Sequence, residues 1–156
     1  MSHLPYRIIA TNPKRKHSMS KLADFRRKAE QMDIEARAKW QALLAQDGDE
    51  VDEDGYPTEL ACERIKAWHW SDRKGWLKYI ESLWHLRSWG WSEADEPHDW
   101  KKDQMVHRYH VSTAGWSGNE TLIRAMQENS MLWHLVWVQS RRGGHYIFEI
   151  EHPEED

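Results

Sequence analysis

The residue types best suited to chemistry are concentrated in one short segment, Ser112-Thr113-Ala114-Gly115-Trp116-Ser117-Gly118-Asn119-Glu120, between a predicted strand and a predicted helix. Ser117 and Glu120 have capping-box spacing, in which the hydroxyl and the carboxylate each accept a backbone N–H at the helix start. Helix N-termini also present unpaired N–H groups that bind anions. The segment therefore predicts either a small polar pocket with Trp116 as a stacking lid, or a capped turn with Trp116 filling the core.

A second candidate element is the tip of a hairpin, where Arg141 and Arg142 precede two glycines. Paired arginines at such a tip are typical of a phosphate or carboxylate contact, and a solvated turn is the alternative. Together the turn and the tip give the predicted ligand- or partner-binding residues: Thr113, Trp116, Ser117, Asn119, Arg141, Arg142 and His145.

The histidines and the single cysteine form no pattern for catalysis or metal binding. His107 and His110 fall on opposite faces of a regular strand, and no His-x-x-x-His helix, cysteine pair or acidic triad accompanies them. Cys62 lies in an amphipathic pattern, where cysteine is more often a small apolar residue than a nucleophile. We predict no catalytic residues, no metal and no cofactor. A small hydrolase that uses His110 or His145 with Glu120 remains a minor alternative.

The apolar spacing predicts the elements that position these residues. Helices begin after Thr58 and after Ser71 or Asp72, which are suitable N-caps. Strands are predicted at residues 86–91, 104–112, 131–139 and 145–151, with a helix at 118–129. The strand at 131–139 is apolar on both faces, which indicates a central position, whereas 145–151 alternates and suits a half-exposed one. The predicted fold is α+β: a four-stranded, mostly antiparallel sheet with helices packed on one face.

A long amphipathic helix is predicted to precede this domain. Its apolar positions recur in steps of three and four: Leu22, Phe25, Ala29, Met32, Ala36, Trp40 and Leu43. This narrow stripe resembles a heptad seam. Three interpretations stay open: packing against its own domain, a dimer or partner helix through Leu22, Phe25, Met32 and Trp40, or nucleic-acid contact through the basic run at 26–28.

Charge divides the chain into regions. Residues 1–40 carry ten Lys or Arg and four Asp or Glu, a balance of +6, whereas residues 41–63 carry eight acids and no base, a balance of −8. We therefore expect a basic flexible arm at 1–17, the long helix at 18–46, an acidic linker at 47–57 and the α+β domain at 58–156. The basic region favours an interacting arm, and folding of the acidic stretch beside it is the alternative.

The chain contains 11 tryptophans. Four fall on predicted apolar stripes or on the strand predicted to be central, and we expect them in the core: Trp76, Trp84, Trp133 and Trp137. The exposure of five others decides whether the tryptophans build a large core or a binding surface: Trp68, Trp70, Trp89, Trp91 and Trp100.

Three short motifs share an order and spacing with a known group. Asp54-Gly55-Tyr56-Pro57-Thr58-Glu59, then the 113–120 segment, then Arg142-Gly143-Gly144-His145-Tyr146, resemble the DGYPT, TGGWSGNE and RGGHY motifs of small uncharacterised bacterial and bacteriophage proteins. The resemblance covers about residues 50–150, and Ala114 replaces an expected glycine. It implies a bacteriophage or mobile-element setting and no particular reaction.

Composition and resemblance together favour an interaction protein. One cysteine, no apolar run long enough for a membrane span and no signal peptide predict a cytoplasmic location in a bacterial host. We expect a non-catalytic protein that binds and modulates a host protein, such as an inhibitor of host defence. Nucleic-acid or nucleotide binding through the basic N-terminal region and the aromatic rings is the first alternative.

Overall fold

The computed structural model describes residues 13–152, and only the backbone of 13–16. The fold divides after Ala36 into two compact units. The helices are α1 (Pro13–Ala45), α2 (Glu59–Ala67), α3 (Arg73–Leu83), α4 (Arg87–Gly90), α5 (Ser117–Glu128) and α6 (Ser130–Val136), and the strands are β1 (Trp91–Pro97), β2 (Met105–Ser112), β3 (Trp137–Arg141) and β4 (His145–Glu151). The predicted α+β class, with a long N-terminal helix, is confirmed.

Helix α1 begins earlier than predicted, at Pro13, so residues 13–17 of the expected flexible arm are helical. Proline suits a first helical position because its missing N–H would have no partner there. The remainder of that arm, residues 1–12, lies outside the described residues. No helix of residues 13–152 combines the length and apolar character that crossing a bilayer requires.

Helices α2 and α3 begin where the sequence predicted. Thr58 accepts a hydrogen bond from the Ala61 amide through its hydroxyl oxygen, and Asp72 accepts one from the Gly75 amide through its carboxylate. Satisfying these otherwise unpaired N–H groups fixes both helix starts. The expected apolar face of α3 is buried and lies in the core with Trp84: Trp76, Leu77, Ile80 and Leu83.

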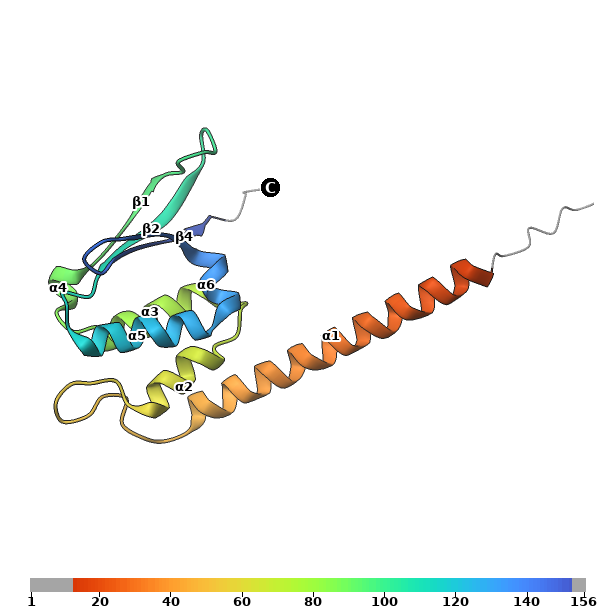
Figure 1. Ribbon diagram of the computed structural model, residues 1–156, viewed down its shortest axis with the longest axis horizontal. Coiled ribbons are helices and arrows are strands. Elements are labelled where there is room, and N and C mark those ends of the chain that lie inside the picture. The colour runs from red at the N-terminus through yellow and green to blue at the C-terminus, as the bar shows by residue number, and fades with distance from the viewer. Residues whose placement is uncertain (1–12, 153–156) are drawn as a thin grey trace, which may run out of the picture. The chain divides into compact units, whose positions relative to one another are not determined.

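The four strands form a fully antiparallel sheet in the order β1-β2-β4-β3. Helices α3 and α5 cover one face of it (Figure 1). Strand β4 lies between β2 and β3, and most of its residues are half-buried, as predicted for residues 145–151. The central position predicted for residues 131–139 is wrong. Strand β3 is an edge strand whose residues are all exposed.

Two predicted strands are partly helical. Residues 130–136 form α6 because Asn129 caps it, accepting a hydrogen bond from the Leu132 amide, and Leu132 and Val136 are buried one turn apart. Residues 87–90 form the single turn α4, after Leu86 adopts a left-handed conformation at φ 55°. The first strand consequently begins at Trp91 and includes the acidic segment that was predicted as a loop.

Some tryptophans are buried in the core and others are exposed. The core contains Trp68, Trp76, Trp84 and Trp91, and Trp133 packs against it half-buried. The core position predicted for Trp137 is wrong: it lies on the edge strand β3 and is 41% exposed. Trp89 and Trp100 are the most exposed, at 69% and 90%.

The predicted acidic linker is an ordered loop held to the C-terminus of α1. Val51 and Pro57 form a β-bridge, and the Asp52 carboxylate accepts hydrogen bonds from the Asp54 and Tyr56 amides. Buried Arg64 donates to the carbonyls of Leu43, Leu44 and Gln46, and pairs with Glu50 at 2.6 Å. This arginine satisfies carbonyl groups that the last turn of a helix leaves unpaired.

Candidate functional site

The three motif segments meet at one end of the sheet. The ring of Tyr56 from the first packs against that of Trp116 from the second, with centroids 4.8 Å apart and planes tilted by 35°. The Thr113 amide donates to the Gly144 carbonyl of the third at 2.9 Å. A Cβ at Gly144 would collide with the Thr113 hydroxyl oxygen, so this approach requires glycine. Segments distant in sequence therefore build one local structure.

Helix α5 begins differently from the prediction. Its N-cap residue is Trp116, which makes no side-chain capping bond, and Ser117 is the first helical residue. The Ser117 hydroxyl instead pairs with the Tyr56 hydroxyl at 3.1 Å. The predicted capping box is therefore absent. With Ser117 as the N-cap the first helical residue would be Gly118, but the helix starts one residue earlier, at Ser117 itself.

The Trp116 ring contacts two other rings. The His85 ring stacks on one part of it at 4.4 Å, in addition to Tyr56. A Cβ at Gly118 would collide with the Trp116 ring, so this glycine lets the indole fold back over the first turn of α5. The indole is half-buried, so it is neither an exposed lid nor a fully buried core residue, the two alternatives that the sequence predicted.

Two exposed apolar side chains follow His85 in the chain, at the start of α4 and within it. Leu86 follows His85 and is 54% exposed, and Trp89, whose amide bonds to the Leu86 carbonyl, is 69% exposed. We call these five residues the aromatic surface: Tyr56, His85, Leu86, Trp89 and Trp116. Sequence reasoning predicted only Trp116 as a binding residue here. Tyr56 had a signal in its motif, whereas His85 and Leu86 have no local signal.

Asn119 fixes the geometry of this surface. The side chain is fully buried. Its carbonyl oxygen accepts from the His85 amide at 2.9 Å, and its amide nitrogen donates to the carbonyls of His85 and Thr113 at 3.0 and 3.3 Å. Asn119 and Thr113, both predicted as ligand-binding residues, are thus occupied with backbone groups that hold His85 and the turn together.

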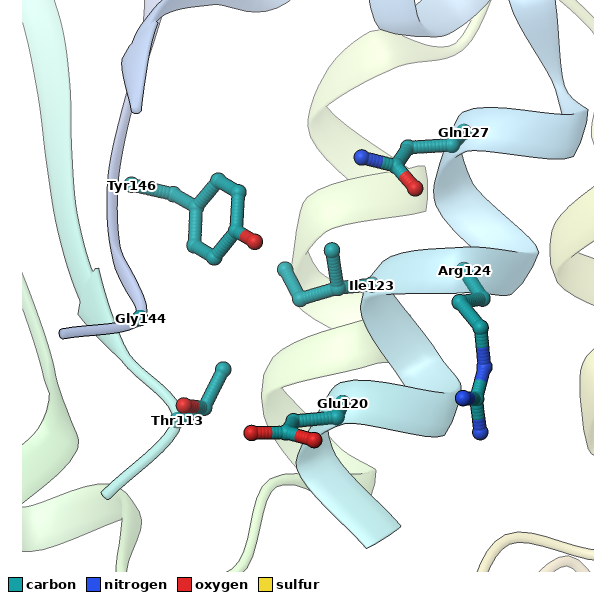
Figure 2. Close-up of a pocket in the computed structure, with 7 residues that line it drawn as sticks. All are labelled: Thr113, Glu120, Ile123, Arg124, Gln127, Gly144 and Tyr146. Atoms are coloured by element: carbon teal, nitrogen blue, oxygen red, sulfur yellow. The ribbon is translucent and has the colours of Figure 1, made fainter. Parts of the chain in front are cut away.

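A hollow of about 190 Å³ lies on the other side of the turn, between α5 and the sheet. It is lined by Thr113, Glu120, Ile123, Arg124, Gln127, Gly144 and Tyr146. Figure 2 shows the Glu120 carboxylate pointing toward Thr113. Arg124 donates to the Thr121 hydroxyl. The hollow is open and mixes one acid with one base, so it has no strong preference for either charge.

The face of the sheet opposite α5 carries a charged network around Arg108. Its guanidinium contacts Glu149 at 2.5 Å, Glu96 at 2.8 Å and Asp99 at 3.0 Å. Burial acts to lower the pKa of Arg108, but its hydrogen bonds to Glu149 and Glu96 outweigh this and raise it above the usual value. His110 extends the network through Glu96 at 3.1 Å. The arginine is fully engaged with carboxylates of its own chain.

His145 lies beside this network, on the face away from the hollow. Tyr146 lines the hollow, so alternation along β4 directs His145 to the opposite face. Its ring is 5.9 Å from that of His110. Burial lowers the pKa of His145, and His110 and Arg141 lower it further. The pair suggested for a hydrolase, His145 with Glu120, is therefore not brought together; Glu96 is the carboxylate that contacts His110.

The two arginines at the hairpin tip are exposed. Arg141 opposes His145 in the ladder between β3 and β4, and its guanidinium donates to the Gln139 side chain. Arg142 is the first residue of the turn, and Gly143 and Gly144 complete it. Neither arginine belongs to the aromatic surface.

The predicted partner residues of α1 differ in exposure. Leu22, Phe25 and Met32 are 51%, 71% and 61% exposed. Trp40 is half-buried and packs on Trp68, with ring centroids 5.4 Å apart. The stripe is therefore exposed at its N-terminal positions and joins the core of the second unit at Trp40.

Metal binding has no support in the described part of the chain, residues 13–152, where no group of three or more His, Cys, Asp or Glu side chains is arranged to hold a metal ion. Burial raises the pKa of the Cys62 thiol, which lowers the thiolate fraction and the reactivity of this residue. Comparison with models of known families, with curated proteins and with solved structures found no match.

Proposed function

We propose that the protein is a non-catalytic interaction protein that binds another protein through its aromatic surface. The observation that carries the proposal is the ring cluster of Tyr56, Trp116 and His85, which exposed Leu86 and Trp89 follow in the chain. Large aromatic side chains dominate the binding energy of protein interfaces because they bury much area with little loss of conformational entropy. Exposed apolar groups gathered in this way mark interaction sites.

Rigidity of the surface also supports the proposal. Asn119 ties the His85 backbone to the Thr113 turn, and the Tyr56 and Ser117 hydroxyls bond to each other. A surface that is ordered before binding loses less entropy on association. Polar groups that would act on a substrate are engaged within the chain: Arg108 with three carboxylates, and Asn119 with backbone groups.

The bacteriophage or mobile-element setting that the motif resemblance implies makes a host protein the proposed partner. Modulation of that protein in the host cytoplasm, including inhibition of a host defence, is the corresponding role. Nucleic acid is the competing partner, because tryptophan faces also stack on bases.

The test is affinity capture from bacterial lysate with the full chain, with and without nuclease, followed by binding of the purified candidate. We expect a stoichiometric protein that survives nuclease treatment and is lost with Trp116→Ala and Trp89→Ala. Trp100→Ala is the matched control, because it removes the most exposed tryptophan, outside the aromatic surface. Gly118→Ala is a milder probe, since its methyl group would displace the Trp116 ring without removing it.

Each other outcome has a meaning. Loss of the captured material on nuclease treatment would favour nucleic acid as the partner. Equal binding by the Trp116→Ala variant and the Trp100→Ala control would refute the assignment of this surface.

A further inference from the structure

We propose that α1 pairs with α1 of a second copy of the chain, in antiparallel orientation, through the seam from Leu22 to Ala36. This surface is separate from the aromatic surface, and the inference does not depend on the proposed function. Phe25, Met32 and Leu22 are between 51% and 71% exposed on a continuous helix, although burying each of them would be favourable. Their spacing matches positions a and d of a heptad repeat.

Heptad positions follow from placing Leu22 at a. Phe25 and Met32 then occupy d, and Ala29 and Ala36 occupy a. Alternating small and large side chains suit an antiparallel pair, in which each a position of one helix faces a d position of the other. Ala29 faces Met32 of the second copy and Ala36 faces Phe25, so both of these large side chains meet a small one.

The charges that flank the seam distinguish the two orientations. With Leu22 at position a, Arg26 and Asp33 occupy e, and Lys28 and Glu35 occupy g. In an antiparallel pair each e position faces an e position of the partner and each g position faces a g position. Arg26 therefore meets Asp33, and Lys28 meets Glu35, of the second copy. Both contacts join opposite charges, and two-fold symmetry repeats each of them. The orientation has no like-charge contact at these positions.

A parallel pair is less favourable. There each g position faces the e position five residues later in the partner, so Lys28 meets Asp33 but Lys21 meets Arg26. One attractive contact is offset by one repulsive contact. Charge complementarity therefore selects the antiparallel arrangement of two copies. The exposed seam covers only two heptads, so we expect a reversible dimer.

Reversing the charge of Arg26 tests the orientation, because the change should weaken an antiparallel dimer and strengthen a parallel one. Sedimentation equilibrium of the full chain over a wide concentration range should show a monomer–dimer equilibrium. Arg26→Glu should weaken the antiparallel dimer at least tenfold, since the introduced carboxylate would face Asp33 of the second copy. Adding Asp33→Arg to it should restore association.

Arg27→Glu is the matched control. It makes the same charge change at the neighbouring position, outside the seam, and breaks an intrahelical pair with Asp24. It should leave the dimerisation constant within about twofold. Circular dichroism would verify that each variant keeps its helix.

Disulfide trapping gives a second, independent measurement in a Cys62→Ser background. A mixture of Phe25→Cys and Ala36→Cys chains should form the mixed disulfide, because these positions face each other in the antiparallel pair. Phe25→Cys chains alone should not crosslink, since their positions would be eleven residues apart along the helix, about 16 Å.

Three results would overturn the inference: a monomer at all concentrations, a tighter dimer in the Arg26→Glu variant, or a disulfide between Phe25→Cys chains alone. None of these results bears on capture of a partner by the aromatic surface. The two proposals therefore fail separately.

Discussion

Individual buried residues at the end of the sheet explain why a motif rich in polar groups need not be a ligand site. Asn119 and Thr113 were attractive binding candidates because of their chemistry, yet both are buried at 0% and 1% exposure and bond to backbone groups. A buried amide must find partners within the chain. The motif thus specifies the position of Trp116 and His85 more directly than it specifies a ligand.

Asn119→Ala should reveal this structural role. The substitution leaves the His85 amide and two carbonyl groups without their partner, so we expect the free energy of unfolding to fall by about 2–3 kcal/mol. Urea denaturation of the full chain measures it. Gln127→Ala, an exposed position on the same helix, should change it by less than about 0.5 kcal/mol. Similar values for the two variants would contradict the role given to Asn119.

Ala114→Gly should stabilise the protein. Ala114 adopts a left-handed conformation at φ 54°, which a Cβ disfavours by about 1–2 kcal/mol, and Gly115 follows at φ 71°. Part of the gain is offset by the greater freedom of glycine in the unfolded chain, so we expect an increase of about 0.5–1 kcal/mol. Thermal and urea unfolding measure it.

The same substitution on β1 provides the control for that prediction. Ala94→Gly lies in a regular strand, where glycine destabilises by about 0.5–1 kcal/mol. The two variants should therefore change stability in opposite directions. Destabilisation by Ala114→Gly would show that the turn has no strain for glycine to release.

Elements with an N-cap residue and one clear periodicity were predictable from the sequence. Helices α2, α3 and α5 and strands β2 and β4 occur close to their predicted ranges. The segment containing Trp133, Leu135 and Trp137 was not, because its apolar residues fit both a helical and a strand period. Asn129 decides between them by capping α6, and its side-chain amide also bonds to the Ile65 and Trp68 carbonyls. Those contacts are tertiary and have no local sequence signal.

The candidate site was predictable only in part for the same reason. Trp116 stands out in its motif, but its neighbours Tyr56 and His85 come from segments 60 and 31 positions away in the chain. Only the packing of α2, α3 and α5 brings them together. The edge strand β1 was missed because nearly all of its residues are exposed and it carries acids on both faces, so its composition resembles a loop.

The charged sheet should make folding sensitive to acid. Hydrogen bonds to His107 and His152 lower the pKa of Asp95, and one from Lys101 lowers that of Glu151. Burial acts to raise the pKa of Glu96, but the hydrogen bonds from Arg108 and His110 outweigh this effect, and the pKa is lowered. A folded-state pKa below the unfolded value means that the unfolded chain binds more protons. The stabilisation is therefore complete above about pH 5 and is lost as the pH falls through the carboxyl range.

His145 should add a separate step at higher pH. Its pKa is lowered in the folded chain by burial, His110 and Arg141, so protonation favours unfolding. Its contribution is complete above the ordinary histidine value of about 6.5 and declines as the pH falls below it. Urea midpoints should fall between pH 7.5 and pH 5.5, and less so in His145→Asn. His134→Asn, an exposed histidine on α6, should keep the wild-type slope. An unchanged slope in His145→Asn would exclude this assignment.

At the scale of the whole molecule, the core is contained in the second unit, which begins at Arg37. All residues of the core cluster, from Ala61 to Phe148, belong to this unit, as do the half-buried residues packed against it, which include Trp40 and Ile150. The charge is divided differently, since the basic excess lies in residues 1–40 and the acidic excess in the segment that follows. The exposed seam of α1, residues 22–36, therefore contributes no residue to the core cluster.

Two truncations should separate these contributions. A chain that begins at Arg37 keeps Trp40 and the last turn of α1, so we expect it to fold with a thermal midpoint within a few degrees of the full chain. A chain that begins at Gln46 lacks the Trp40 ring that packs on Trp68. It also lacks the Leu43 and Leu44 carbonyl groups that accept hydrogen bonds from buried Arg64. Leaving that guanidinium without these partners should cost about 3 kcal/mol or more. Calorimetry and near-ultraviolet circular dichroism measure both, and equal midpoints for the two chains would show that the end of α1 does not stabilise the body.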